Sequence, residues 1–131
     1  MKYLLDTSCL ISLIKDLHNV RNAIVNAGIE NCGISEISLA ELLYGAFKGG
    51  YESHAAEVEF VKETFSIVPI KDSLKTYGRI KAELEAKGSK IDDFDLLIGV
   101  SALDNKLTLV THNTRHFERI PGLKLIDWEQ P

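Results

Sequence analysis

The sequence predicts an α/β fold with a mainly parallel central sheet, and two features of the chain lead to this expectation. Short β-type apolar runs alternate with longer segments of helical spacing, an order that is typical of βαβ units. The chain has 131 residues, of which 45% are hydrophobic, and this is enough for the core of one domain. Because no repeat or linker is visible, we expect a single domain over residues 1–131.

The first expected strand is the apolar run Tyr3–Leu5. Thr7 or Ser8 can cap the helix that follows, in which apolar residues recur at helical spacing as far as Ile14. A second helical segment covers Val20–Ala27 and ends at a glycine. The polar side chain of Asp6 is therefore expected at the exit of the first strand.

The middle of the chain repeats this alternation. Residues 32–34 form a short expected strand, and Ser35 is placed to cap a helix over residues 36–46. A glycine pair then breaks the pattern before a polar helix over about residues 52–65. The next strand is expected around residues 67–68.

The last part of the chain holds two more helices and two more strands. One helix is expected over residues 73–86, ending near Gly88, and the next is expected to open at Asp92. Residues 107–110 form a β-run, and a last short strand is expected over residues 123–126.

Charge and cysteine content restrict the function and the compartment. The net charge is −4 and the pI is near 5.5, whereas nucleic-acid binders usually show a basic excess; an acidic metal site would explain part of this difference. Cys9 and Cys32 form neither a CxxC motif nor a disulfide framework. Asp6 interrupts the only signal-like run, and no segment approaches the roughly 18 apolar residues of a membrane span. We therefore expect a cytoplasmic protein that does not enter a membrane.

Four polar side chains follow or flank apolar runs: Asp6, Glu41, Asp95 and Asn113. Side chains at the carboxyl ends of parallel strands, and on helices over those ends, converge in the crevice where open α/β sheets bind ligands. Three of the four are acids, and such oxygen ligands suit Mg²⁺ or Mn²⁺. A metal site is therefore one interpretation of this pattern.

Each of these residues also has a structural interpretation. Asp6 can be a turn residue or a helix cap, and Asn113 can be a turn former. Glu41 can be salt-bridged or exposed, although its helix is otherwise apolar or small, and a buried lone carboxylate is costly. With Asp92 as cap, Asp95 occupies the third helical position, where an acid favours the helix end.

Other chemistries find less support in the sequence. His112 and His116 are four residues apart, but the residues between them look like a turn, so we do not expect a zinc pair. There is no GxSxG motif, and the glycine pair has no following Lys-Ser/Thr to hold phosphate. Cys9 lies inside an expected helix and is interpreted as a core residue.

The motifs YLLDTS, SLAELLYGA, GRIKAELEAKGSKIDDFDLLIGVSAL and VTHNTRHFERIPGLKLIDW cover nearly the whole chain. In order and spacing they resemble the PIN-domain ribonucleases, specifically the VapC toxins of bacterial toxin–antitoxin pairs. The resemblance implies a PIN-like three-layer sandwich with helices on both faces of the sheet. Fold class and function are thereby expected together.

The resemblance also implies roles for individual residues. Asp6, Glu41 and Asp95 take three acidic metal-site positions, and Asn113 takes a fourth position where many PIN domains carry Asp. The supporting hydroxyls would be Thr7 and Thr111, while Asp92 and Asp93 are interpreted as helix-cap residues. Mg²⁺, or Mn²⁺, held by Asp6 and Asp95 would activate a water for phosphodiester hydrolysis, leaving 5′-phosphate and 3′-hydroxyl ends.

The implied partners are RNA, a second copy of the chain and a VapB-like antitoxin whose tail enters the acidic groove. Lys75 and Arg79 recur at four-residue spacing after Lys71 and could contact RNA phosphates, or they could form a solvated face. One alternative function is a catalytically weak PIN-like module that binds RNA or protein. Another, a phosphatase or receiver-type domain, lacks its expected DxD motif or late lysine.

Overall fold

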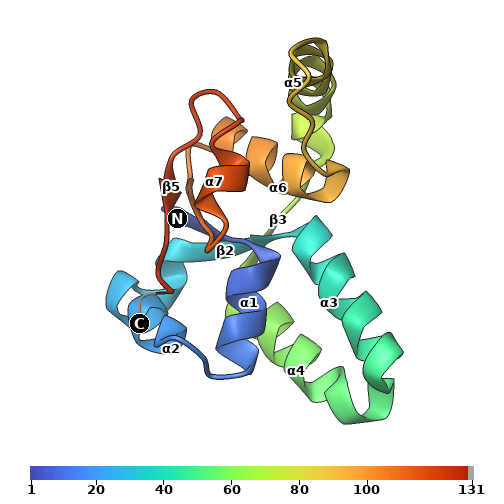
Figure 1. The fold of residues 1–131 in the computed structure, drawn as a ribbon. Coiled ribbons are helices and arrows are strands. Elements are labelled where there is room, and N and C mark those ends of the chain that lie inside the picture. Colours follow the sequence, from blue (N-terminus) through green and yellow to red (C-terminus); the bar gives the residue numbers. More distant parts are fainter. Residues whose placement is uncertain (130–131) are drawn as a thin grey trace.

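Residues 1–129 are described by the computed structural model, and they contain a five-stranded sheet with helices on both faces (Figure 1). The strand order is β3-β2-β1-β4-β5, and each of the four pairings is parallel. The predicted α/β fold with a parallel sheet is therefore confirmed. The single domain over 1–131 remains a prediction, and its last two residues lie outside the described part.

The elements follow one another in the predicted alternation. The strands are β1 (Tyr3–Leu5), β2 (Cys32–Ser35), β3 (Ser66–Val68), β4 (Thr108–Val110) and β5 (Leu125–Ile126). The helices are α1 (Thr7–Ile14), α2 (Val20–Ala27), α3 (Glu36–Gly49), α4 (Tyr51–Thr64), α5 (Leu74–Ala86), α6 (Asp93–Asp104) and α7 (Thr114–Phe117). Two 3-10 turns, η1 (Ile29–Asn31) and η2 (Lys71–Ser73), precede β2 and α5.

The central strand β1 divides the core into two layers. Leu4 and Leu5 are both fully buried, and successive strand residues point to opposite faces of a sheet. Leu5 packs in a cluster with apolar residues of α1, α2, α3 and α4, whereas Leu4 packs with residues of α5, α6 and α7. Figure 1 shows these two groups of helices on opposite sides of the sheet, which confirms the predicted three-layer sandwich.

The helix caps differ in part from those expected. Ser35 caps α3 as predicted, accepting a hydrogen bond from the Ile37 N–H at 3.1 Å. The expectation that Thr7 or Ser8 caps α1 was wrong. Asp6 is the cap, because it remains extended at the end of β1 and its side chain accepts from the backbone of the third helical residue, as capping requires.

The start of α6 also differs in part from the sequence prediction. Asp92 caps α6 as expected, but Asp93 does not share that role. It is the first residue of the helix, and its carboxylate lies 2.9 Å from Lys81 Nζ and accepts a 2.8 Å hydrogen bond from the Tyr77 hydroxyl. The two adjacent acids therefore face different partners.

The segment after β4, expected to be a turn, contains the short helix α7. Phe117 at its end is 1% exposed and belongs to the core on the α6 side of the sheet. The packing there is close, since a Cβ built on Gly99 would lie 2.4 Å from Ile120 Cδ1. The face of α6 that bears Gly99 is therefore tightly packed, and tertiary contacts rather than local sequence select α7.

Within the described residues, no helix combines the length and the apolar composition needed to cross a membrane.

Candidate active site

Asp6 lies where β1 ends and α1 begins, and its side chain is almost fully buried. Its Oδ1 accepts hydrogen bonds from Ser8 Oγ at 2.8 Å and from the Cys9 N–H at 2.9 Å, and the Thr111 hydroxyl is a further partner. Burial raises the pKa of the Asp6 carboxyl, and the nearby Asp95 charge raises it further, although the hydrogen bonds act in the opposite direction. The carboxylate is thus both positioned and held in an unfavourable environment for its charge.

Glu41 reaches the same region from α3. The Thr7 hydroxyl donates a 2.7 Å hydrogen bond to Glu41 Oε1, and Ser38 Oγ lies 3.0 Å from Thr7 Oγ1. Because the single hydroxyl proton of Thr7 is given to Glu41, Ser38 must be the donor to Thr7. Burial is the main cause that raises the pKa of Glu41, and the charges of Asp95 and Asp6 also contribute.

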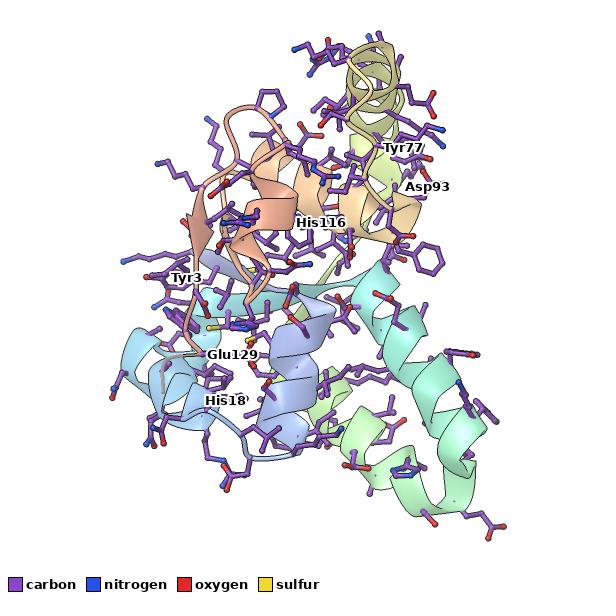
Figure 2. All side chains as sticks on the ribbon, viewed as in Figure 1. Tyr3, His18, Tyr77, Asp93, His116 and Glu129 are labelled. Atoms are coloured by element: carbon purple, nitrogen blue, oxygen red, sulfur yellow. The ribbon has the colours of Figure 1, made fainter. Side chains whose placement is uncertain are left out.

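Asp95 is supplied by the first turn of α6 on the other side of the sheet. Its Oδ2 lies 3.0 Å from Nε2 of His116, which Figure 2 shows on α7. Burial raises the pKa of Asp95 and the Asp92 charge adds to this, whereas His116 lowers it. The Asp95 backbone N–H also approaches the capping carboxylate of Asp92 at 3.5 Å. The backbone of Asp95 thus contacts the helix cap, while its side-chain charge acts on Asp6 and Glu41.

Asp6, Glu41 and Asp95 form what we call the acidic cluster. Each of the three pairs is close enough for one charge to raise the pKa of another. Within residues 1–129, no Lys or Arg forms an ion pair with any of these carboxylates, and the His116 imidazole is the one basic side chain in contact with them. A cluster of buried oxygen donors with a deficit of positive charge fits a hard divalent cation such as Mg²⁺ or Mn²⁺.

Asn113 is joined to this cluster through its backbone. Its N–H donates a 2.9 Å hydrogen bond to the Thr111 hydroxyl oxygen, and Thr111 is in turn a partner of Asp6. The Asn113 side chain is exposed and does not cap α7. The supporting role of Thr111 thus agrees with its hydrogen bond to Asp6. A role for the Asn113 side chain stays a prediction.

The basic residues proposed for RNA lie apart from the acidic cluster, on α5. Lys75 and Arg79 are exposed, and Arg79 Nη1 lies 3.3 Å from Glu83 Oε1. Lys71 belongs to the preceding turn η2 rather than to α5. An ion pair within one helix, such as Arg79–Glu83, is typical of a solvent-exposed helix face. The contact of Lys75 and Arg79 with RNA therefore remains a prediction.

Two residues beside the acidic cluster were missed by the sequence reasoning. Ser38 is fully buried one helical turn before Glu41, and this i, i+3 spacing was the signal that could have found it. His116 was considered only as half of a zinc pair with His112. In the structure the two imidazoles contact different carboxylates, since His112 approaches Asp127 and Glu129.

The helix around Glu41 is otherwise apolar or small, as the sequence shows, yet α3 exposes the large side chains of Tyr44 and Phe47, at 68% and 66%. Apolar composition of α3 is therefore not sufficient evidence that Glu41 is buried. Burial nevertheless raises the pKa of Glu41, while the Thr7 hydroxyl bonded to it acts in the opposite direction.

Comparison with known proteins assigns the chain to a family. The PIN domain matches residues 3–123. The tRNA(fMet)-specific endonuclease VapC of Salmonella typhimurium is 35% identical over 130 residues, covering 98% of both chains, and the ribonuclease VapC2 of Haemophilus influenzae is 36% identical over 132 residues, also covering 98% of both. The crystal structure of VapBC2 from Rickettsia felis bound to a promoter DNA fragment contains a similar chain, with a TM-score of 0.87, 34% identity and coverage of 98% of this chain and 99% of that one. The resemblance inferred from the motifs is confirmed: the chain belongs to the PIN domain family and, within it, to the VapC proteins.

Proposed function

We propose that this chain is a Mg²⁺- or Mn²⁺-dependent endoribonuclease and the toxin of a toxin–antitoxin pair. The observation that carries the proposal is the acidic cluster, in which three carboxylates on separate elements raise one another's pKa without a Lys or Arg partner among the described residues. The names of the relatives, a tRNA(fMet)-specific endonuclease and a ribonuclease, support RNA as the substrate.

The residues of the acidic cluster have distinct tasks in this proposal. Asp6 and Asp95 bind the cation directly, and Glu41 binds it through water or holds a second ion. When bound, the cation supplies a water of lowered pKa and neutralises charge on the scissile phosphate. Thr7 and Thr111 hold Glu41 and Asp6 in place through their hydroxyl groups. Asn113, directly before α7, is the fourth residue of the proposed site.

The oxygens not engaged by the protein are the ones proposed to bind the cation. In the described part of the chain, the hydrogen bond to Glu41 uses Oε1, and the contact between His116 and Asp95 uses Oδ2. Oε2 of Glu41 and Oδ1 of Asp95 are therefore the oxygens proposed for the cation. Because the 2′-hydroxyl of RNA takes no part in this hydrolysis, the products carry 5′-phosphate and 3′-hydroxyl ends.

The proposed partners follow from the relatives and from the surface. The Rickettsia felis structure is a VapBC2 complex, which supports a VapB-like antitoxin here, with an arginine of its tail entering the acidic cluster. A homodimer is proposed because apolar side chains are exposed, including Tyr44 and the stacked rings of Phe47 and Tyr51, 4.3 Å apart. The buried free thiols of Cys9 and Cys32 are consistent with a reducing cytoplasm.

Analysis of the cleavage products tests the proposed chemistry. Purified protein is incubated with RNA and Mn²⁺, and the new ends are identified by their reaction with a 5′-phosphate-dependent exonuclease and a 3′-end ligase. We expect 5′-phosphate and 3′-hydroxyl ends, none of which form with D95N. Ends bearing 2′,3′-cyclic phosphate would refute the proposed water attack, and retention of RNA binding without cleavage would favour the weak binding module.

A further inference from the structure

A second group of possible metal ligands lies on the other side of the sheet from His116. It consists of His112, which follows β4, and of Asp127 and Glu129, which follow β5. His112 Nδ1 lies 3.2 Å from Asp127 Oδ2 and 3.5 Å from Glu129 Oε2. Figure 2 shows Glu129 beside α1, whereas His116 lies on α7. We call this group the C-terminal triad.

The triad is held in place by contacts that do not involve a metal. The Glu129 side chain is only 8% exposed, and its Oε1 accepts a hydrogen bond from the Ser12 hydroxyl of α1. The Glu129 N–H donates a 2.8 Å hydrogen bond to Asp127 Oδ1. Between them, the ring of Trp128 packs on Tyr3 with centroids 4.8 Å apart. The two carboxylates are therefore fixed relative to each other and to the sheet.

The two distances from His112 in the triad match those between ligands of one metal ion. Zinc bonds to imidazole nitrogen and carboxylate oxygen are about 2.0–2.2 Å long, so two ligand atoms at a tetrahedral angle lie about 3.3–3.6 Å apart. The two distances from His112 Nδ1 are 3.2 and 3.5 Å, and the ligand atoms of the three residues all lie within 4.8 Å of one another. Only small movements of the exposed imidazole are needed to place an ion between them.

We propose that the C-terminal triad binds a transition-metal dication of the Zn²⁺ type and so fastens residues 127–129 to the loop that carries Asn113. The triad offers an imidazole nitrogen beside two carboxylates, and nitrogen ligands favour Zn²⁺ over Mg²⁺. The ion binds His112 Nδ1 in its unprotonated form, so a proton on that nitrogen moves to Nε2 when the imidazole is neutral and to solvent when it is protonated; water completes the coordination.

Titration with Zn²⁺ and Co²⁺ tests this site independently of nuclease activity. The full chain carries D95N and is kept in excess Mg²⁺, so that binding at the acidic cluster is suppressed. We expect one equivalent of Zn²⁺ by calorimetry, a Co²⁺ absorption spectrum of a four- or five-coordinate site, and a rise in melting temperature with Zn²⁺.

Two variants separate a metal site from an ion pair of His112 with its carboxylates. H112Q, which changes an exposed side chain, is expected to weaken Zn²⁺ binding at least about tenfold and to abolish the rise in melting temperature. H54Q is the matched control, since His54 lies 2.7 Å from Glu57 but, among the described residues, belongs to no group of three candidate ligands; it should bind Zn²⁺ like the parent. Absence of Zn²⁺ binding in the parent, or equal affinity in H112Q, would refute the proposal.

Discussion

His116 Nε2 lies 3.0 Å from Asp95 Oδ2, and this contact joins α7 to the first turn of α6. The imidazole is only 23% exposed, and it meets the ring of its buried neighbour Phe117 edge-on at 5.5 Å. The ring is therefore held by the core on one side while it contacts the carboxylate on the other. Since metal-binding carboxylates are commonly oriented by such hydrogen bonds, His116 is expected to position Asp95.

Replacement of His116 should weaken metal binding. Without the imidazole, the Asp95 carboxylate loses the partner that fixes its orientation, so we expect H116A to bind Mn²⁺ about tenfold more weakly, with a smaller loss in H116Q, which can still donate a hydrogen bond. Calorimetric titration of Mn²⁺ in the absence of RNA measures this. H18Q serves as a control for loss of an exposed imidazole in the loop before α2, and Mn²⁺ affinity unchanged in H116A would show that the contact does not position Asp95.

The metal-free protein should become less stable as the pH rises above the usual range of carboxyl groups. The pKa values of Asp6, Glu41 and Asp95 are raised in the folded state, so between the unfolded pKa of about 4 and the folded pKa the folded chain holds more protons. The free energy of unfolding therefore falls with rising pH across that window and stays low above it.

Urea unfolding of the metal-free protein at a series of pH values measures this effect. D6N should reduce the pH dependence, and D95N should leave metal-free stability at neutral pH unchanged or higher, because each removes one of the repelling charges. Asn at position 6 can still cap α1. A stability that rises with pH in this window, or a clear loss of metal-free stability in D95N, would mean that capping and pairing outweigh repulsion in the acidic cluster.

How far the sequence predicted the structure can be judged from particular residues. The parallel sheet and the cap at Ser35 were predicted, because each depends on local pattern or on the alternation of strands and helices. The cap of α1 was misassigned. Three neighbours, Asp6, Thr7 and Ser8, can all cap a helix, and only the end of β1 decides which one remains extended.

The parts of the candidate site that the sequence did not predict depend on tertiary contacts. Helix α7 has four residues, too few for a helical pattern to be visible, and it is stabilised by the burial of Phe117. His116 therefore could not be placed beside Asp95, from which it is separated by most of α6 and all of β4. The C-terminal triad likewise forms only because β4 and β5 are neighbours in the sheet.

Loss of the Thr7 hydroxyl should impair both stability and cleavage. T7V keeps the shape of the side chain but removes the donor to Glu41 and the acceptor for Ser38, so we expect a loss of about 1–2 kcal/mol in the free energy of unfolding and slower cleavage. T7S retains the hydroxyl and should behave nearly as the wild type. If T7V unfolds and cleaves like T7S, Thr7 does not support the acidic cluster.

The exposed cations of α5 are predicted to contribute to RNA binding and not to the chemical step. Replacement of Lys75 and Arg79 by Ala should weaken RNA binding and reduce its salt dependence by about one to two phosphate contacts, with turnover at saturating RNA near normal. E83Q frees Arg79 from its ion pair and should strengthen binding slightly. Unchanged RNA binding in the double variant would mean that Lys75 and Arg79 belong to a solvent-exposed helix face without a role in RNA binding.

Inhibition by the antitoxin can be tested with the purified pair. If an arginine of the antitoxin tail enters the acidic cluster, the complex should cleave RNA much more slowly than the free toxin, and replacing that arginine by Ala should restore part of the rate. The rate is followed with a labelled RNA at equal toxin concentration. Equal rates for complex and free toxin would rule out this mode of inhibition.

The central claim is that the carboxylates of Asp6, Glu41 and Asp95 hold a divalent cation that RNA cleavage requires. The most direct measurement is the initial rate of RNA cleavage by the wild type and by D95N, purified in parallel, in Mn²⁺ and after chelation. We predict cleavage by the wild type in Mn²⁺, its loss on chelation and its return when Mn²⁺ is restored, with none by D95N in any condition. Wild-type cleavage that persists after chelation, or a folded D95N that cleaves as fast as the wild type, would contradict the claim.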